Sequence, residues 1–196
     1  MRIDLQKFHS ESGRPHKRYV VVGTSGSGKS TLAGELAHQF GYPHVELDDI
    51  NWLLGWKMRT DEEFRRLVDQ ESSKPDWIID GNYTKSRDIV WPRADAIIWL
   101  DLPFRVVMSR IIWRSFWRGL EGRVMWGGCK ASLKRGFLSR DSVVLWAART
   151  WKMRRETYGE ILYNQSNEHL DIFRVTSSDF RNIEVRRARQ ASPQPA

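Results

Sequence analysis

The chain has 196 residues, of which 40% are hydrophobic, so a single domain can bury a sizeable core. Its one cysteine, Cys129, excludes a disulfide framework and fits a reducing cytoplasm, where we expect the protein to reside. The net charge of +8 suits partners that carry phosphate groups, and we expect no membrane partner because no apolar run reaches the roughly 18 to 20 residues of a membrane span.

The start of the chain predicts a disordered arm followed by a buried strand. Residues 1–17 are largely polar and lack the apolar stretch of a signal peptide, so we expect them to be disordered. Residues 19–22 form a short β-type apolar run. Residues 31–38 have the pattern of a helix, which Gly41 and Pro43 end.

A glycine-rich loop lies between this strand and this helix. Residues 23–30 read Gly-Thr-Ser-Gly-Ser-Gly-Lys-Ser, which fits the pattern G-x-x-x-x-G-K-S. The glycines let successive N–H groups point at phosphate oxygens, and the helix N-terminus adds a positive dipole. We therefore expect Lys29 to reach the β- and γ-phosphates of ATP, and the Ser30 hydroxyl to bind Mg²⁺. The candidate cofactor-binding residues are Gly23, Thr24, Ser25, Gly26, Ser27, Gly28, Lys29, Ser30 and Thr31.

The middle of the chain alternates strand and helix patterns. Thr60 and Glu63 have the spacing of a capping box and predict the start of a helix. The stretch before them, residues 49–56, reads as a loop. Strands are predicted, in chain order, at residues 44–48, 76–80 and 96–100.

The second half is helical and basic. Residues 104–155 contain thirteen Lys or Arg against Glu121 and Asp141, a net charge of +11, which leaves −3 for the rest of the chain. We expect this charge to close over a triphosphate, with binding to nucleic acid as the second interpretation. The predicted elements are helices at 104–117 and 139–163, a glycine-rich mobile lid at about 119–136, a strand at 171–176, a basic helix at 178–189 and a disordered tail at 191–196.

This alternation predicts a three-layer α/β/α P-loop NTPase fold, with a five-stranded parallel sheet and a helical basic lid. We expect one such domain over residues 18–190. Ligands bind at the carboxyl ends of strands in such sheets, where this chain has acids, namely Asp48, Asp49, Asp80 and Asp101. Carboxylates there suit binding of Mg²⁺ and orientation of an attacking hydroxyl.

Several segments resemble the adenylate kinase-like group of small P-loop kinases. The resemblance rests on the glycine-rich loop, the strand end at 79–81, the strand end at 101–103 and the pair Arg140 and Asp141. Residues 48–52, 77–83 and 139–142 are most similar to topology modulation proteins and adenylate kinase-like proteins. The resemblance covers about residues 18–180 and implies phosphoryl transfer from Mg²⁺-bound ATP to a small acceptor.

The resemblance also implies roles for single residues. Asp80 matches the acid that lies beside the metal and the acceptor in nucleoside monophosphate kinases, and with Lys29 it is a candidate catalytic residue. Arg110, Arg140 and Arg149 resemble arginines that reach the phosphates from the lid and its flanking helices. Guanidinium groups suit this task because they bind phosphoryl oxygens in pairs and offset charge in the transition state.

One departure from this pattern concerns the acceptor. Adenylate kinases have Asp-Gly-Phe-Pro-Arg where this chain has Asp-Gly-Asn-Tyr-Thr, so Thr84 replaces the arginine that binds the acceptor phosphate. A small hydroxylated metabolite is then at least as plausible an acceptor as AMP. The candidate acceptor-binding residues are Asp48, Asp49, Trp52, Asn82 and Tyr83.

The ten tryptophans have two interpretations. Trp52 and Trp56 are candidates for an aromatic cage around the acceptor. Trp113 and Trp117 have helical spacing and predict a buried stripe. The competing class of protein is a nucleotide-dependent regulator that binds nucleic acid through the basic segment. The acceptor and the oligomeric state stay open.

Overall fold

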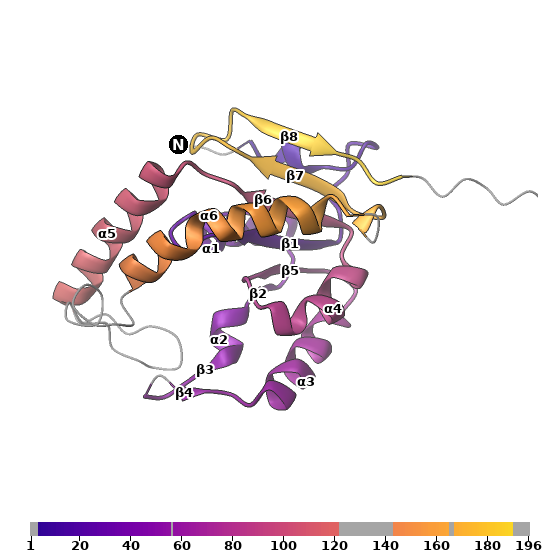
Figure 1. Cartoon of the computed structure of the whole chain (residues 1–196). Coiled ribbons are helices and arrows are strands. Elements are labelled where there is room, and N and C mark those ends of the chain that lie inside the picture. Colours follow the sequence, from indigo (N-terminus) through magenta and orange to yellow (C-terminus); the bar gives the residue numbers. More distant parts are fainter. Residues whose placement is uncertain (1–3, 56, 122–142, 165–166, 190–196) are drawn as a thin grey trace, which may run out of the picture.

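A computed structural model describes residues 4–55, 57–121, 143–164 and 167–189 of the chain, and every structural statement below concerns these residues. Its main sheet has the strand order β2-β5-β1-β6-β7-β8 (Figure 1). The first five strands run parallel, and β8 pairs antiparallel with β7. The strands are β1 (Arg18–Gly23), β2 (His44–Glu46), β5 (Trp77–Asp80), β6 (Ala96–Leu100), β7 (Asp171–Val175) and β8 (Ile183–Arg186).

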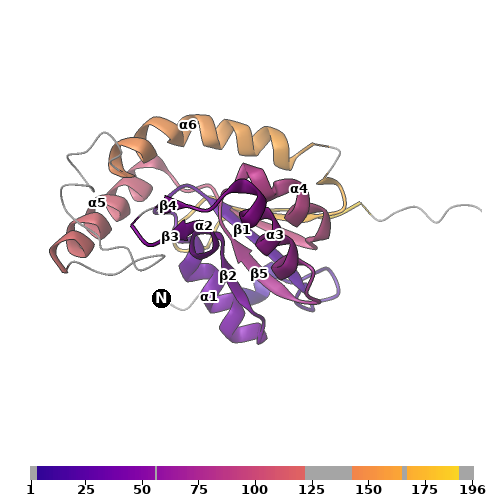
Figure 2. The ribbon, with the colours of Figure 1, turned by 90° about the horizontal axis from the view of Figure 1, so that it is seen from below.

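Helices cover both faces of this sheet, as Figure 2 shows for α1 and α6 on opposite sides. On one face, α1 (Lys29–Phe40) packs Leu32 and Leu36 onto the strands. On the other face, residues of α3, α4 and α6 form a second buried cluster with the strands. The bounds of these three helices are Asp61–Ser72 for α3, Arg87–Val90 for α4 and Val143–Leu162 for α6. Helix α5 (Phe104–Glu121) packs against α6. The predicted three-layer α/β arrangement is confirmed.

Short elements fill the connections. The stretch expected as a loop at 49–56 contains instead part of the short helix α2 (Leu47–Asn51) and the first strand of a hairpin, β3 (Trp52–Leu53) with β4 (Lys57–Met58). Two 3-10 helices, η2 (Thr84–Ser86) and η3 (Trp91–Arg93), flank α4. As predicted, Thr60 caps α3, and its Oγ1 accepts a hydrogen bond from the Glu63 N–H at 3.2 Å.

The sheet is larger than predicted. The basic helix expected at 178–189 is wrong, because Ile183–Arg186 forms β8 at the edge of the sheet. The many arginines in this stretch are good helix formers, but Phe173 and Val175 of β7 offer an open edge that pairs with it in register. The sheet therefore has six strands rather than five.

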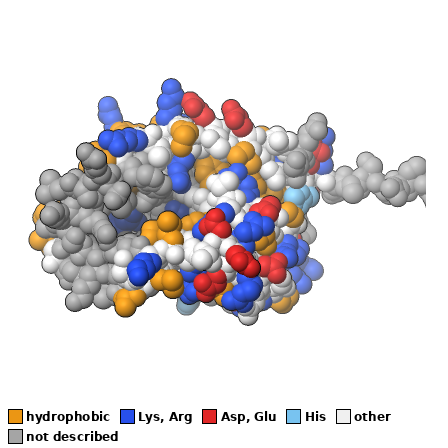
Figure 3. Space-filling view, turned by 60° about the horizontal axis from the view of Figure 1, so that its bottom comes forward, with side chains coloured by type: hydrophobic (Ala, Val, Ile, Leu, Met, Phe, Trp, Pro, Cys, Tyr) orange, Lys and Arg blue, Asp and Glu red, His pale blue; other side chains and the backbone are white. Residues whose placement is uncertain are grey.

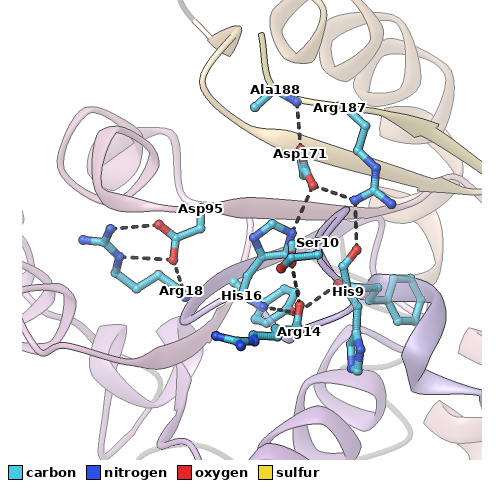
Figure 4. Close-up of polar contacts among 12 residues, drawn as sticks. His9, Ser10, Arg14, His16, Arg18, Asp95, Asp171, Arg187 and Ala188 are labelled. Carbon is cyan, nitrogen blue, oxygen red and sulfur yellow. Dashed lines mark hydrogen bonds and ion pairs between the residues drawn. The ribbon is translucent and has the colours of Figure 1, made fainter. Parts of the chain in front are cut away.

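The N-terminal arm is also different from the expectation of disorder over 1–17. Residues Leu5–Phe8 form a 3-10 helix, η1, whose Leu5 and Phe8 are buried in the same cluster as α1. His16 lies 3.1 Å from the carboxylate of Asp171, and the guanidinium group of Arg187 forms an ion pair with the same carboxylate at 2.7 Å (Figure 4). Only two apolar side chains anchor the arm, which is why composition did not reveal it.

The prediction of a buried aromatic stripe on α5 is wrong. Trp113 and Trp117 were expected to be buried, but 66% and 44% of their surfaces are exposed. The buried face of α5 is formed by Val107 and Ile111, which pack against Ala147 of α6. Among the described residues, no helix combines the length and apolar character that crossing a bilayer needs.

Part of the predicted lid can be compared with the structure. Helix α5 continues through residues 119–121, and the rest of the expected lid lies outside the described residues, as do Trp56, Cys129, Arg140 and the tail at 191–196.

Candidate active site

The glycine-rich loop connects the carboxyl end of β1 to the first turn of α1. Gly23, Gly26 and Gly28 all have positive φ angles, of 151°, 80° and 98°. A Cβ atom at Gly23 would lie only 2.8 Å from the backbone oxygen of Leu100 and from Ser27 Oγ, so the strand and the loop approach too closely for any other residue. The predicted cofactor residues therefore form one tight turn that leads into a helix N-terminus.

Asn82 fixes the start of this loop. Its Oδ1 accepts the Gly23 N–H at 3.2 Å, and its Nδ2 donates to the Gly23 oxygen at 2.5 Å. The Tyr158 hydroxyl of α6 donates to the same Oδ1 at 3.1 Å. Asn82 was expected to shape the acceptor pocket, but both ends of its amide are engaged in joining β1, the end of β5 and α6.

Cationic side chains reach the loop from α5. Arg110 donates to the backbone oxygen of Ser27 at 3.1 Å, and Arg114 donates to Ser25 Oγ at 3.2 Å. The two residues are four apart and therefore lie on the same face of the helix. Sequence reasoning named Arg110 and missed Arg114, although this spacing was a usable signal.

Helix α6 supplies a further cation, but not the one expected. Arg149 is exposed, whereas Arg154 is half-buried and helps to line a cavity of about 10 Å³ beside Thr24 and Tyr158. Burial lowers the pKa of Arg154, which the nearby Tyr158 partly offsets. Helix periodicity alone cannot tell which of these arginines faces the loop, because that depends on how α6 packs on the sheet.

Lys29 lies between cations and carboxylates. Its Nζ is 3.5 Å from the backbone oxygen of Thr24 across the loop. Burial lowers the pKa of Lys29, the carboxylates of Asp80 and Asp48 raise it, and the guanidinium groups of Arg114 and Arg154 lower it again. The net direction is downward. The side of the loop that faces α5 and α6 is thus positive, and the side that faces β2 and β5 is negative.

Asp80 is the buried acid of the negative side. It ends β5, is only 2% exposed, and its Oδ2 lies 2.9 Å from Nε2 of His44. Burial alone would lower the pKa of His44, but the hydrogen bond and charge of Asp80, with the charges of Glu46 and Asp49, raise it. Sequence reasoning missed His44, which the alternation of β2 places on the same face as Glu46.

Asp48 and Asp49 differ in their surroundings. The Tyr83 hydroxyl donates to Asp48 Oδ1 at 2.5 Å, and the ring of Tyr83 packs on Phe64 with ring centroids 5.1 Å apart. Burial and the charge of Asp48 raise the pKa of Tyr83 well above its usual range. Asp49 is exposed as a residue, but part of its side chain is shielded from water. This partial burial, together with the charges of Asp48 and Asp80, raises the pKa of Asp49.

The other predicted residues have varied positions. Ser30 is half-buried and Thr31 exposed in the first turn of α1, and Trp52 is half-buried in β3. Asp101, the third strand-end acid, pairs with Arg155 at 3.0 Å and with Arg174 at 2.6 Å, so its carboxylate joins α6 to β7.

The face formed by α2, α3, η2 and α4 holds many paired charges. Lys85 donates to Asn51 Oδ1 at 3.0 Å and to Asp61 Oδ1 at 2.8 Å. Arg65 pairs with Asp88 at 2.7 Å. Figure 3, which brings the α3 end of the molecule forward, shows acidic and basic side chains interspersed on this face. This mixture differs from a basic surface built for an anion.

A glycine-rich loop between the first strand and first helix of a mostly parallel sheet defines a P-loop kinase-like fold. Among solved structures, the chain is similar to shikimate kinase from Bacteroides thetaiotaomicron, with a TM-score of 0.50 and 15% sequence identity. That match covers 84% of this chain and 88% of the kinase, and at this identity it shows the fold alone.

Among curated proteins, the chain is 28% identical over 129 residues to the uncharacterized protein YqaC of Bacillus subtilis (strain 168). The match covers 65% of this chain and 72% of YqaC. No family model matches the chain.

Proposed function

We propose that the protein is a phosphotransferase that moves the γ-phosphoryl group of ATP, bound with Mg²⁺, to a small acceptor. The observation that carries the proposal is the division of charge around the glycine-rich loop that contains Lys29: Arg110 and Arg114 of α5 donate to the loop, whereas the buried carboxylate of Asp80 ends β5, which pairs with β1. Phosphoryl transfer needs this division, because cations must neutralise the transferred group while carboxylates orient the metal and the nucleophile.

The loop fits a triphosphate. Ser27 Oγ is buried and has no hydrogen-bond partner among the described residues, so the turn contains a polar atom that a ligand could satisfy. A Cβ atom at Gly26 would overlap the side chain of Ile111, so the turn can approach α5 closely only because residue 26 is glycine. The first N–H groups of α1 also lack acceptors within the helix and favour an anion there.

The residues of the chain then have distinct tasks. Lys29, Arg110, Arg114 and Arg154 hold the phosphates and offset the charge that develops during transfer. Ser30 and Asp80 would hold Mg²⁺ through oxygen atoms, and the ion would supply positive charge that offsets the charge of the phosphates. Asp48 is the candidate to accept a hydrogen bond from the acceptor hydroxyl.

The acceptor we favour is a small hydroxylated metabolite. Thr84 is exposed at the position where adenylate kinases have a phosphate-binding arginine, and the neighbouring Lys85 already binds Asn51 and Asp61. Asp48 and Asp49 add negative charge, which disfavours an acceptor that is itself an anion.

The test is ADP release from Mg²⁺-bound ATP, with a panel of nucleoside monophosphates, sugars, sugar acids, aminoglycosides and other polyols. We expect one hydroxylated acceptor to stimulate release, and Lys29→Ala to lower that rate by at least about a hundredfold. The matched control is Lys17→Ala, which changes an exposed lysine next to the amino end of β1. Stimulation by none of these acceptors, or turnover by Lys29→Ala close to that of wild type, would contradict the proposal.

The nucleic-acid alternative stays a prediction. It depends on the basic segment, a large part of which, at 122–142, lies outside the described residues.

A further inference from the structure

Three potential metal ligands lie together on the α1 face of the sheet. Strand alternation puts His44 and Glu46 on one face of β2, while Val45 between them packs into the cluster on the other face. The parallel register pairs Glu46 with Asp80, and it pairs His44 with Ile78, which packs on the α1 face. Asp80 lies two residues after Ile78 and therefore shares that face.

The distances among their ligand atoms suit one ion. One imidazole nitrogen of His44, one carboxylate oxygen of Glu46 and one of Asp80 lie within 4.8 Å of one another. The separation of 2.9 Å between His44 Nε2 and Asp80 Oδ2 matches two ligands at right angles around an ion, since bonds of about 2.1 Å place such ligands roughly 3.0 Å apart.

The orientation and access of the imidazole also suit this role. A Cβ atom at Gly34 of α1 would lie 4.0 Å from His44 Nδ1, so this nitrogen faces the helix while Nε2 faces the two acids. The His44 side chain is 20% exposed, whereas that of Asp80 is 3% exposed. An ion could therefore enter from the His44 side and keep water in its remaining positions.

The local charge favours a cation. Asp48 and Asp49 lie in α2, which follows β2, so four carboxylates, those of Glu46, Asp48, Asp49 and Asp80, belong to β2, α2 and the end of β5. One imidazole nitrogen and two carboxylates form a donor set typical of Mn²⁺, Co²⁺ or Zn²⁺, whereas Mg²⁺ prefers oxygen donors alone.

We propose that His44, Glu46 and Asp80 form a binding site for a divalent transition-metal ion. The site differs from that of the Mg²⁺ in the proposed phosphotransferase reaction in its other ligands, which are His44 and Glu46 of β2 rather than Ser30 and the nucleotide. The two sites share Asp80, so an ion bound by His44 would occupy the carboxylate beside the glycine-rich loop.

The test is binding of Mn²⁺ to the full chain without nucleotide, followed by the electron paramagnetic resonance signal of free Mn²⁺. We expect one ion per chain in wild type, and dissociation constants at least tenfold weaker in His44→Ala and in Glu46→Gln. His38→Ala is the matched control, because His38 is exposed on α1 and lies outside the cluster. Binding should also release a proton at pH 6, since His44 must give up its proton to bind metal.

Two controls make the result decisive. Circular dichroism and thermal unfolding must show that the variants are folded, and Glu46→Gln keeps the shape of the side chain if His44→Ala does not fold. Absence of Mn²⁺ binding to wild type, or equal binding by folded His44→Ala and wild type, would overturn the inference. Neither result depends on phosphotransfer, so the proposed function is tested separately.

Discussion

At the scale of single residues, both positive and negative side chains act on Lys29. The arginines that act on Lys29 come from α5 and α6, whereas the carboxylates that act on it come from the end of β5 and from α2. Arg154 is half-buried among these groups, and Arg149, one and a half turns earlier on α6, is exposed. The two arginines therefore differ in what they can contact.

This difference gives a direct comparison of two substitutions. We expect Arg154→Ala to reduce ATP turnover by at least about tenfold, because a half-buried guanidinium beside the loop stabilises phosphate charge. Arg149→Ala should change turnover less than twofold, since its charge is solvated. Steady-state rates with the best acceptor of the panel measure both. If Arg149 is the phosphate-binding residue, as the sequence predicts, Arg149→Ala should reduce turnover more than Arg154→Ala does. That result would contradict the role proposed here for Arg154.

At the scale of elements, polar and apolar contacts attach short segments to the sheet. Asn82 ties the start of the glycine-rich loop to the end of β5, and Asp101 ties α6 to β7 through two arginines. The 3-10 helix η1 is attached differently, by the full burial of Phe8, whose ring meets that of Phe173 edge-on with centroids 5.6 Å apart.

The anchoring of η1 predicts a large loss of stability for a change far from the site. Phe8→Ala should lower the free energy of unfolding by about 3 to 5 kcal/mol, because it removes a fully buried aromatic ring. Phe116→Ala, which changes a ring that is 43% exposed on α5, should cost about 1 kcal/mol or less. Urea denaturation followed by circular dichroism compares the two, and equal losses would mean that the N-terminal arm is not packed.

At the scale of the whole molecule, the segment before β1 and the segment after β8 meet at the start of β7. Asp171 at the start of β7 contacts His16 before β1 and Arg187 after β8 (Figure 4). Burial lowers the pKa of His16; the charges of Asp171 and Asp95 raise it in part, and that of Arg187 lowers it. The net direction is downward.

This shift predicts an acid sensitivity of the fold. In the unfolded chain His16 takes up a proton near its ordinary pKa of 6.5, whereas in the folded protein it does so only at lower pH. Stability should therefore be highest above pH 6.5 and fall as the pH drops through the window below it. The drop in urea midpoint from pH 7.5 to 5.5 should be smaller for His16→Gln than for wild type and the exposed control His38→Gln. An equal drop in all three proteins would show that His16 does not contribute.

Much of the fold could be predicted from local pattern. Residues 19–22, 76–80, 96–100 and 171–176 are short apolar runs, and parallel strands buried on both faces have that composition wherever they occur. The glycine-rich loop could also be predicted, because the glycines that its positive φ angles require all lie within eight consecutive residues. β8 and η1 could not, since each depends on a partner distant in sequence, β7 for the one and the α1 face for the other.

The sequence by itself determined the glycine-rich loop, the layered α/β fold and the acids at the strand ends, because each follows from contacts between near neighbours along the chain. Only the tertiary structure decided that Arg154 is half-buried beside the loop while Arg149 is exposed, that Asn82 holds Gly23, and that His44 and Glu46 meet Asp80. The rotation of a helix on a sheet and the register between strands are set by packing between distant segments, and no local pattern contains that information.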